Sequence, residues 1–216
     1  MADFTRATSY VKICGVTSIH DAQVVIDAGA DALGLIFAES TRQLSPSSGR
    51  RIAESTKGAI LRVGVFRHDS DEFVLRCVDE TGVDVAQIHG SLSDELLDAL
   101  RRRDVAVIKA LSVGGDEFSH FDEGRVDAVL IDGPTPGSGR EHPWPDLETR
   151  NFQRPVIVAG GLNPTNVASV ARLTRAWGVD VSSGVESAPG VKDASRVRDF
   201  VMNARTSLER PEEPHD

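Results

Sequence analysis

The chain is poor in the residues and runs that define several protein classes. It has two cysteines, Cys14 and Cys77, in 216 residues. They form no C-x-x-C pair, so a disulfide scaffold is excluded and two free thiols in a reducing compartment are expected. No apolar run approaches the roughly 18 residues that a membrane helix needs, and the N-terminus lacks the apolar core of a signal peptide. We therefore expect a cytoplasmic protein with no membrane partner.

Positive charge is also scarce. The chain holds 24 lysines and arginines against 33 aspartates and glutamates, a formal net charge of −9. A surface of that sign repels polyanions, so a nucleic-acid partner is disfavoured. The last ten positions hold four acids and one base, and the rest of the chain carries a net charge of −6. We expect residues 1–206 to form one domain and residues 207–216 to be a disordered acidic tail.

Short β-branched or apolar runs recur along the chain and alternate with segments that have helical features. The expected strands are 10–13, 32–37, 61–66, 84–88, 105–109, 128–131, 156–159 and 179–182. The expected helices are 19–28, 47–57, 71–80, 94–102, 117–123, 165–175 and 194–204, with a short, weak one at 146–150. Eight strands at about 27 residues per unit predict an α/β fold, a single-domain (β/α)8 TIM barrel. An open doubly wound sheet is the alternative.

Polar residues at the strand ends are the candidates for chemistry, because parallel barrels build their active sites there. Alternation along the first strand places Lys12 and Cys14 on one side and Val11 and Ile13 on the other. The lysine is expected to lower the pKa of the Cys14 thiol. A small buried hydrophobe is the alternative role for Cys14, and core packing is the expectation for Cys77.

The sixth strand ends in Asp132, which precedes Gly133 and a proline. A turn or loop-capping aspartate is the alternative interpretation. In a barrel, Asp132 would instead face Cys14 across the mouth, and a thiolate opposite a carboxylic acid indicates paired proton transfers. The expected substrate contacts at other strand ends are Lys12, His89 and Asp180.

Two loops late in the chain have features of a phosphate site. Gly160 and Gly161 follow the seventh strand, and Ser183 and Gly184 follow the eighth. Glycine lets the backbone approach a ligand closely, and the loops after strands seven and eight often hold phosphate in this fold. Turn glycines are the alternative. Arg42, after the second strand, has a planar guanidinium suited to a carboxylate, although most loop arginines are solvated surface charges.

The ordered motifs of the chain resemble the phosphoribosylanthranilate isomerase family of tryptophan biosynthesis. The resemblance extends from Tyr10 to about Ala204. It rests on the segments Val11–Thr17, Arg42–Pro46, Arg62–Phe66, Gln87–Gly90, Ile131–Asp132, Gly137–Gly139, Ala159–Leu162 and Val179–Glu186. The resemblance implies a TIM barrel, no metal or organic cofactor, a phosphorylated small-molecule substrate with a carboxylate, and a monomer or homodimer.

The reaction implied by the resemblance is an Amadori rearrangement. N-(5′-phosphoribosyl)anthranilate becomes 1-(o-carboxyphenylamino)-1-deoxyribulose 5-phosphate. Carried onto matching positions, the resemblance assigns Cys14 as general base, Asp132 as general acid and Arg42 as the partner of the anthranilate carboxylate. It assigns the phosphate to the loops at Gly161 and Ser183–Gly184.

The chain departs from the family pattern in two places. The segment between Asp132 and the Gly137–Gly139 motif is short, and Gln43 stands where an aromatic residue is common. These departures put loop closure and the preferred aromatic group in question and leave a specialised aromatic pathway open. Another sugar-phosphate barrel enzyme, such as a ribulose-phosphate epimerase or indole-glycerol-phosphate synthase, is the second hypothesis. A non-catalytic binder of phosphorylated metabolites is the third.

Overall fold

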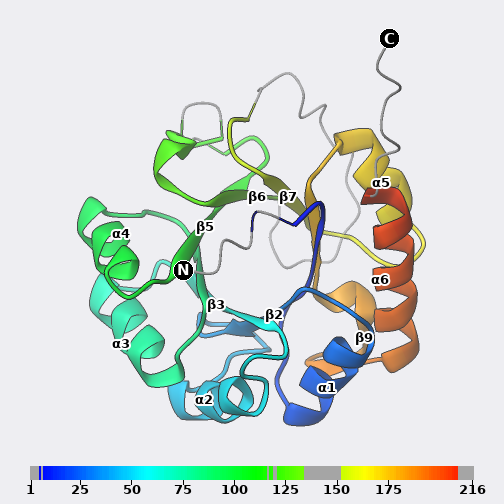
Figure 1. Ribbon diagram of the computed structural model, residues 1–216, viewed down its shortest axis with the longest axis horizontal. Helices are drawn as coiled ribbons and strands as arrows, with labels where there is room; N and C mark the ends of the chain where they lie inside the picture. The colour runs from blue at the N-terminus through cyan, green and yellow to red at the C-terminus, as the bar shows by residue number, and fades with distance from the viewer. Residues whose placement is uncertain (1–4, 6, 116, 119–120, 134–151, 209–216) are drawn as a thin grey trace.

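Eight parallel strands close into a barrel, as Figure 1 shows in a view down the molecule. The computed structural model describes residues 5, 7–115, 117–118, 121–133 and 152–208. The strands are β1 (Tyr10–Ile13), β2 (Ala32–Ile36), β3 (Leu61–Arg67), β4 (Val85–His89), β5 (Ala106–Ser112), β6 (Ala128–Asp132), β7 (Val156–Ala159) and β8 (Gly178–Val181). Parallel pairing of β1 with β8 closes the ring, which confirms the predicted barrel and excludes the alternative of an open doubly wound sheet.

Helices surround the barrel on its outside (Figure 1). They are α1 (Ile19–Asp27), α2 (Pro46–Ser55), α3 (Asp71–Thr81), α4 (Asp94–Arg101), α5 (Val167–Thr174) and α6 (Ala194–Leu208). Serine side chains cap the first turns of α1 to α4, where each hydroxyl accepts a backbone N–H. Pro46 is the first residue of α2, one position before the expected start of this helix. None of the helices in these described ranges is long and apolar enough to cross a bilayer.

The alternation of side chains creates two apolar layers. Val11 and Ile13 pack in the layer between the strands and the helices, together with Cys77 of α3. Cys14 belongs to the second layer, inside the barrel, and Lys12 on the same side of β1 is fully buried. The predicted division of β1 into an outer and an inner side is therefore confirmed, and Cys77 is a core residue.

The fifth expected helix is absent from the described residues between β5 and β6. Residues 117–123 were expected to be helical, but the described part of this segment forms turns and a short 3-10 helix, Glu123–Arg125. A single i to i+4 bond joins Phe121 N–H to the Glu117 carbonyl. Seven residues between two glycine-containing turns are too few to offset the cost of helix nucleation. The expected helix at 146–150 and the Gly137–Gly139 motif lie outside the described residues.

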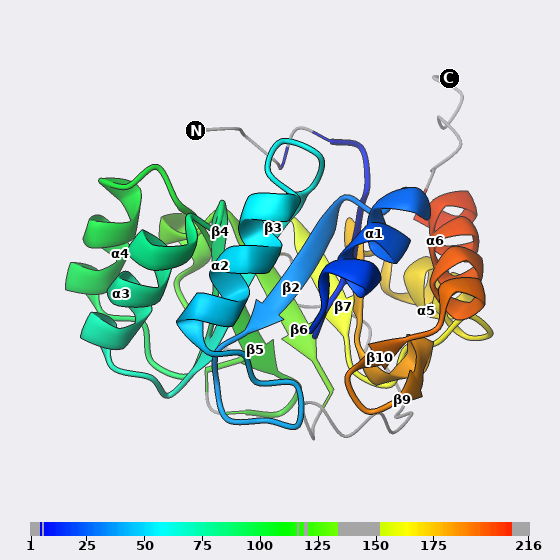
Figure 2. The ribbon, with the colours of Figure 1, turned by 90° about the horizontal axis from the view of Figure 1, so that it is seen from below.

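The C-terminal helix is longer than expected. It runs through Leu208, whose side chain is buried in the core, so Ser207 and Leu208 belong to the folded body rather than to the tail. The remaining tail positions lie outside the described residues. Between β8 and α6 the chain forms a second feature that the sequence did not predict, an antiparallel hairpin of β9 (Glu186–Ala188) and β10 (Val191–Lys192). Figure 2 shows this hairpin at the end of the barrel where the strand arrowheads point.

Candidate active site

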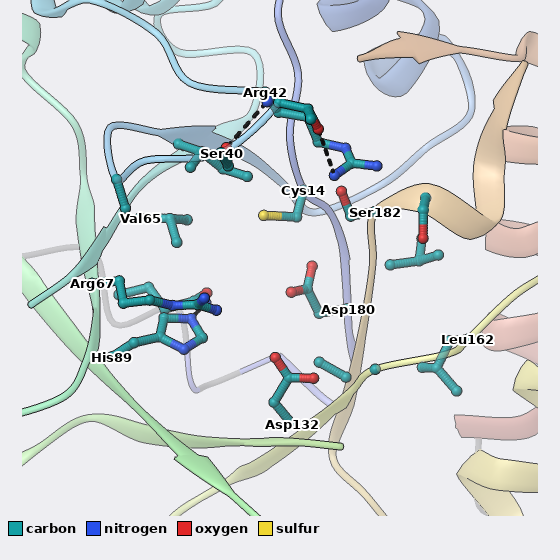
Figure 3. Close-up of a pocket in the computed structure, with 18 of the residues that line it drawn as sticks. Cys14, Ser40, Arg42, Val65, Arg67, His89, Asp132, Leu162, Asp180 and Ser182 are labelled. Carbon is teal, nitrogen blue, oxygen red and sulfur yellow. Dashed lines mark hydrogen bonds between the residues drawn. The ribbon is translucent and has the colours of Figure 1, made fainter. Parts of the chain in front are cut away.

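A cavity of about 290 Å³ opens at the C-terminal ends of the strands. Eight of the ten predicted site residues line it, and Figure 3 shows the side chains of Cys14, Asp132 and Asp180 pointing toward its centre. The predicted residues in the lining are Cys14, Arg42, His89, Asp132, Gly160, Gly161, Asp180 and Ser183. Lys12 and Gly184 are not in the lining, because Lys12 lies a layer deeper in the barrel and Gly184 packs against the backbone carbonyl of Leu162.

Cys14 follows the last residue of β1, and its N–H donates to the Val181 carbonyl at 2.7 Å. Burial raises the pKa of the thiol, and although the ammonium of Lys12 lowers it, Asp180 raises it again. The predicted effect of Lys12, a lowering of the thiol pKa, is confirmed in direction, although burial outweighs it and the net shift is upward. Burial therefore favours the thiol form of Cys14 over the thiolate.

Asp132 ends β6 and is buried. Burial raises the pKa of its carboxyl group to about 6, and the negative charge of Asp180 adds to this effect, whereas the Gly133 N–H and Arg67 oppose it. Its Oδ1 atom has no hydrogen-bond partner among the described residues. Near neutral pH this group is therefore able to hold and release a proton, as a general acid must.

Gly160 makes room for the Asp132 carboxyl group. Its φ of +93° is a conformation that residues with a side chain rarely adopt, and a Cβ atom at this position would lie 2.5 Å from Asp132 Oδ1. Gly160, predicted as part of a phosphate-binding loop, thus also provides the space that the Asp132 carboxyl group occupies. An alanine here would have to displace both the carboxylate and the backbone of Gly133, whose nitrogen would lie 2.6 Å from the added Cβ.

Lys12 and Asp180 form a buried ion pair, with Nζ and Oδ1 2.8 Å apart. Burial alone would lower the pKa of Lys12, but Asp180 and then Cys14 raise it above its ordinary value. Lys12 is thus a fixed cation beneath the cavity floor. Because it faces Asp180 and not the cavity, the prediction that it contacts substrate is not supported by its position.

Arg42 has a carboxylate partner within the chain. Its Nε and Nη2 atoms each donate to an oxygen of Glu186 at 2.7 Å, and Lys192 Nζ donates to Glu186 Oε1 at 2.9 Å. Burial would raise the pKa of Glu186, but its bonds to Arg42 and Lys192 lower it. Sequence reasoning missed this cluster. Glu186 is the last residue of the final family motif, and no role was assigned to it. Lys192 lies just before the expected helix 194–204 and was not considered as a site residue.

The loop after β7 arranges its polar groups differently from the expectation. The helix α5 begins at Val167, and the side chain of Asn163 accepts the N–H groups of Thr165 and Asn166 at 2.8 and 3.1 Å. These N–H groups are therefore not available to a phosphate. The N–H of Gly161 makes no hydrogen bond within the described part of the chain, and Gly161 lines the cavity.

His89, at the end of β4, contacts Gln87 through an interaction of 2.9 Å between Gln87 Nε2 and His89 Nε2. Burial lowers the pKa of His89 to about 3, and the cations Arg67, Lys12 and Lys109 lower it further. The ring is therefore neutral at pH 7. Gln87 and Arg67 also line the cavity, and neither was predicted as a site residue. In the described ranges, no group of three or more His, Cys, Asp or Glu side chains is placed to hold a metal ion.

Comparisons with known proteins agree with this geometry. The family model described as N-(5′phosphoribosyl)anthranilate (PRA) isomerase matches residues 11–203. The N-(5′-phosphoribosyl)anthranilate isomerase of Desulforudis audaxviator is 40% identical over 205 residues, covering 92% of this chain and 98% of the relative. That of Streptococcus pneumoniae is 34% identical over 200 residues, covering 93% and 98%.

Solved structures give the same family. A crystal structure of phosphoribosyl anthranilate isomerase from Thermus thermophilus superposes with a TM-score of 0.80 at 38% identity, covering 91% of this chain and 98% of that one. A second structure holds reduced 1-(o-carboxyphenylamino)-1-deoxyribulose 5-phosphate and matches with a TM-score of 0.76 at 34% identity, covering 92% and 99%. Both likenesses extend over the whole barrel.

Proposed function

Since the chain belongs to the N-(5′-phosphoribosyl)anthranilate isomerase family, we propose that Cys14 and Asp132 move the protons of its reaction, Cys14 as general base and Asp132 as general acid. The protein is an isomerase of tryptophan biosynthesis. It rearranges the aminoaldose N-(5′-phosphoribosyl)anthranilate into the aminoketose 1-(o-carboxyphenylamino)-1-deoxyribulose 5-phosphate.

The observation that carries the assignment is the pairing of these two groups in one cavity. Asp132 has a pKa of about 6 and protonates the furanose ring oxygen, which opens the ring to an iminium ion. The Cys14 thiolate then removes the C2′ proton, and the resulting enolamine tautomerises to the ketone. The cation of Lys12 below Cys14 favours the thiolate during this step, against the effect of burial.

The substrate contacts follow from the ring of loops around these two groups. We assign the phosphate to the loops at Gly161 and Ser183–Gly184, where Gly161 offers a backbone N–H. Asp180 of β8 and His89, at the end of β4 on the opposite side, also line the cavity, and we assign the sugar hydroxyls to them. The lining also includes Arg42, to which we assign the anthranilate carboxylate. Glu186 takes one N–H of Nε and one of Nη2, and Thr41 accepts a long hydrogen bond of 3.4 Å from Nη1, so N–H groups of Nη1 and Nη2 remain for the substrate.

Single replacements test the two proton-transfer roles. Cys14→Ala and Asp132→Asn should each lower kcat by about 10²- to 10⁴-fold, because each removes one general acid or base. Turnover of phosphoribosylanthranilate is measured without added metal, and circular dichroism checks that both variants are folded. Cys77→Ala, a change at the other buried thiol, is the matched control and should keep its turnover. Full activity of Cys14→Ala or of Asp132→Asn would remove the corresponding role.

The oligomeric state and the cellular location of the protein are also proposals. We propose a monomer or homodimer in the cytoplasm, supported by two buried free thiols and by a related isomerase from Thermotoga maritima that is described as dimeric and has been made monomeric. Light scattering on the purified chain distinguishes the two assemblies. A higher oligomer would contradict the proposal.

A further inference from the structure

Glu186 is a buried acid at the edge of the active site that the proposed proton transfers do not use. It is the first residue of β9 and directly follows the turn Ser183–Val185. Its carboxylate accepts hydrogen bonds from Nε and Nη2 of Arg42, both at 2.7 Å, and from Nζ of Lys192 at 2.9 Å. Three hydrogen bonds from charged donors hold a buried carboxylate in one orientation.

The pair between Arg42 and Glu186 uses only one edge of the guanidinium group. A guanidinium has five N–H donors, of which two lie parallel on the edge formed by Nε and Nη2 and two on the end formed by Nη1 and Nη2. Glu186 occupies the edge. At the end, the described residues provide only a long hydrogen bond of 3.4 Å from Nη1 to Thr41. A second carboxylate can therefore bind the end of the same guanidinium group through two donors.

The charges of the cluster leave room for one more anion. Arg42 and Lys192 carry two positive charges, and Glu186 carries one negative charge. The second hydrogen-bond partner of Lys192 is the backbone carbonyl of Ser182, which has no net charge. One positive charge among these three side chains is thus uncompensated, and a single carboxylate would neutralise it.

The aliphatic part of Arg42 is held in place as well. Gly15 has a φ of +72°, and a Cβ atom there would lie 2.5 Å from Arg42 Cδ and 2.9 Å from Ser182 Oγ. The arginine therefore packs directly on the backbone of the residue that follows Cys14. Figure 3 shows Arg42 on the same side of the cavity as Cys14 and Ser182. Contacts along the side chain and at the guanidinium edge together fix the direction of its end.

The same segment of chain carries the proposed phosphate loop. Ser183 and Gly184 precede Glu186 in the sequence by a few positions. The backbone on both sides of them is anchored, since Lys192 Nζ donates to the Ser182 carbonyl at 3.1 Å and Arg196 Nη1 donates to the Glu186 carbonyl at 2.5 Å. One anchored segment thus fixes the acid of the cluster relative to the phosphate loop.

We propose that Glu186, fixed by Lys192, is a positioning residue that holds the edge of the Arg42 guanidinium so that its end binds the carboxylate of the substrate's aromatic ring. The inference rests on the proposed function, which assigns this carboxylate to Arg42. Folding, and not binding, then bears the entropic cost of ordering the arginine. Removal of Glu186 should therefore weaken carboxylate recognition, even though it makes the site more positive.

The test compares the binding of two stable product analogues by calorimetry. They are reduced 1-(o-carboxyphenylamino)-1-deoxyribulose 5-phosphate and the same molecule without its carboxyl group. The wild type should bind the carboxylated analogue about 10- to 100-fold more tightly, as expected for hydrogen bonds between charged groups. Glu186→Ala should reduce this preference to about a tenth of its wild-type value, because the guanidinium is no longer aligned, while the other analogue binds as before.

Glu186→Gln keeps the size of the side chain and one acceptor for Arg42, so its preference should lie between those of Glu186→Ala and the wild type. It also serves as the test variant if Glu186→Ala does not fold, which circular dichroism checks. In steady-state turnover, Glu186→Gln should raise the KM for phosphoribosylanthranilate more than it lowers kcat. The reason is that the carboxylate contact is present both in the substrate complex and in the transition state.

Glu54→Gln is the matched control. It weakens an arginine–glutamate pair with the same N–O distance of 2.7 Å on the exposed face of α2, and it should keep the full preference. An unchanged or increased preference in both Glu186 variants would overturn the positioning role, since it would mean that Glu186 only competes for Arg42. Equal weakening of both analogues would also overturn it, because a general structural role predicts that result.

Arg42→Met distinguishes this inference from the proposed function. If Arg42→Met keeps the preference, or if the wild type has none, the carboxylate contact assigned to Arg42 is wrong. An inactive wild type would contradict the proposed reaction. If Arg42→Met loses the preference and the Glu186 variants keep it, the proposed function stands and the positioning role alone is contradicted.

Discussion

The two sides of the cavity use their charges differently. On the side of β1, β2 and β8, Lys12, Arg42 and Lys192 are matched by the carboxylates of Asp180 and Glu186. On the side of β3 and β4, Arg67 has no such partner among the described residues and lies beside a neutral histidine.

Burial explains the difference. Lys12 and Lys192 have no exposed side-chain surface. A buried charge without a partner lowers the stability of the fold by several kcal/mol, whereas a charge at the mouth of the cavity is solvated by water. The paired side is therefore complete before a ligand arrives. On the unpaired side, the Arg67 guanidinium keeps its N–H donors free of carboxylates in the described part of the chain.

The largest effect on stability is expected on the paired side. Glu186→Ala leaves Lys192 buried without its carboxylate and frees Arg42, and should lower the free energy of unfolding by about 3–5 kcal/mol. Urea denaturation of the variant and the wild type measures this decrease in the free energy of unfolding. Glu54→Ala, which breaks an exposed pair with Arg50, should cost less than about 1 kcal/mol. Similar losses in the two variants would show that the cluster around Glu186 is not a structural unit.

A smaller, pH-dependent effect is expected at Asp132, between the two sides. Its pKa is about 6 in the folded protein and near 3.8 in the unfolded chain, so the folded state binds the proton more tightly. Its contribution to stability is fully present below about pH 4 and is lost as the pH rises through 6. At pH 8, Asp132→Asn should therefore be more stable than the wild type by up to about 3 kcal/mol.

Urea denaturation at pH 4 and pH 8 measures the gain, which should nearly vanish at the lower pH. Asp98→Asn, at an exposed position on α4, should give the same small change at both values. A gain at Asp132 that does not depend on pH would mean that the charge of this carboxylate is not what destabilises the fold.

The smallest effect is expected on the unpaired side. Arg67→Met should change the free energy of unfolding by no more than about 0.5 kcal/mol, because it breaks no ion pair and the residue is exposed. Arg42→Met removes the two hydrogen bonds from Arg42 to Glu186 and leaves Lys192 as the remaining cation, and it should cost clearly more in the same denaturation series. If Arg67→Met proves as costly as Arg42→Met, the contrast between a paired and an unpaired side fails.

Much of the fold was predictable because its signals are local. Apolar runs marked all eight strands, and serines before Pro46 and Asp94 marked helix starts. The segment after β5 was misjudged because seven residues with helix-like composition do not make a helix without packing to support it. The hairpin β9–β10 was missed since two and three residues are too short to show a strand pattern.

The candidate site was predictable in its positions and less so in its interactions. Strand-end reasoning found Cys14, Asp132 and Asp180, because parallel strands bring their C-terminal ends together. The same reasoning did not find that Glu186, 144 residues away in the sequence, accepts hydrogen bonds from Arg42. Arg67 was overlooked although it directly follows the predicted strand 61–66, since an arginine after an apolar run looks like a solvated charge.

The sequence by itself determined the eight repeating units, the two sides of each strand and the set of polar residues at the mouth, since these follow from periodicity and chain order. Only the tertiary structure decided which charges neutralise one another and how strongly burial acts on Cys14. Ring closure between β1 and β8 brings Lys12 to Asp180, and the enclosed barrel, not the neighbouring lysine, governs the thiol. Pairing and desolvation depend on the whole fold, so no local pattern reports them.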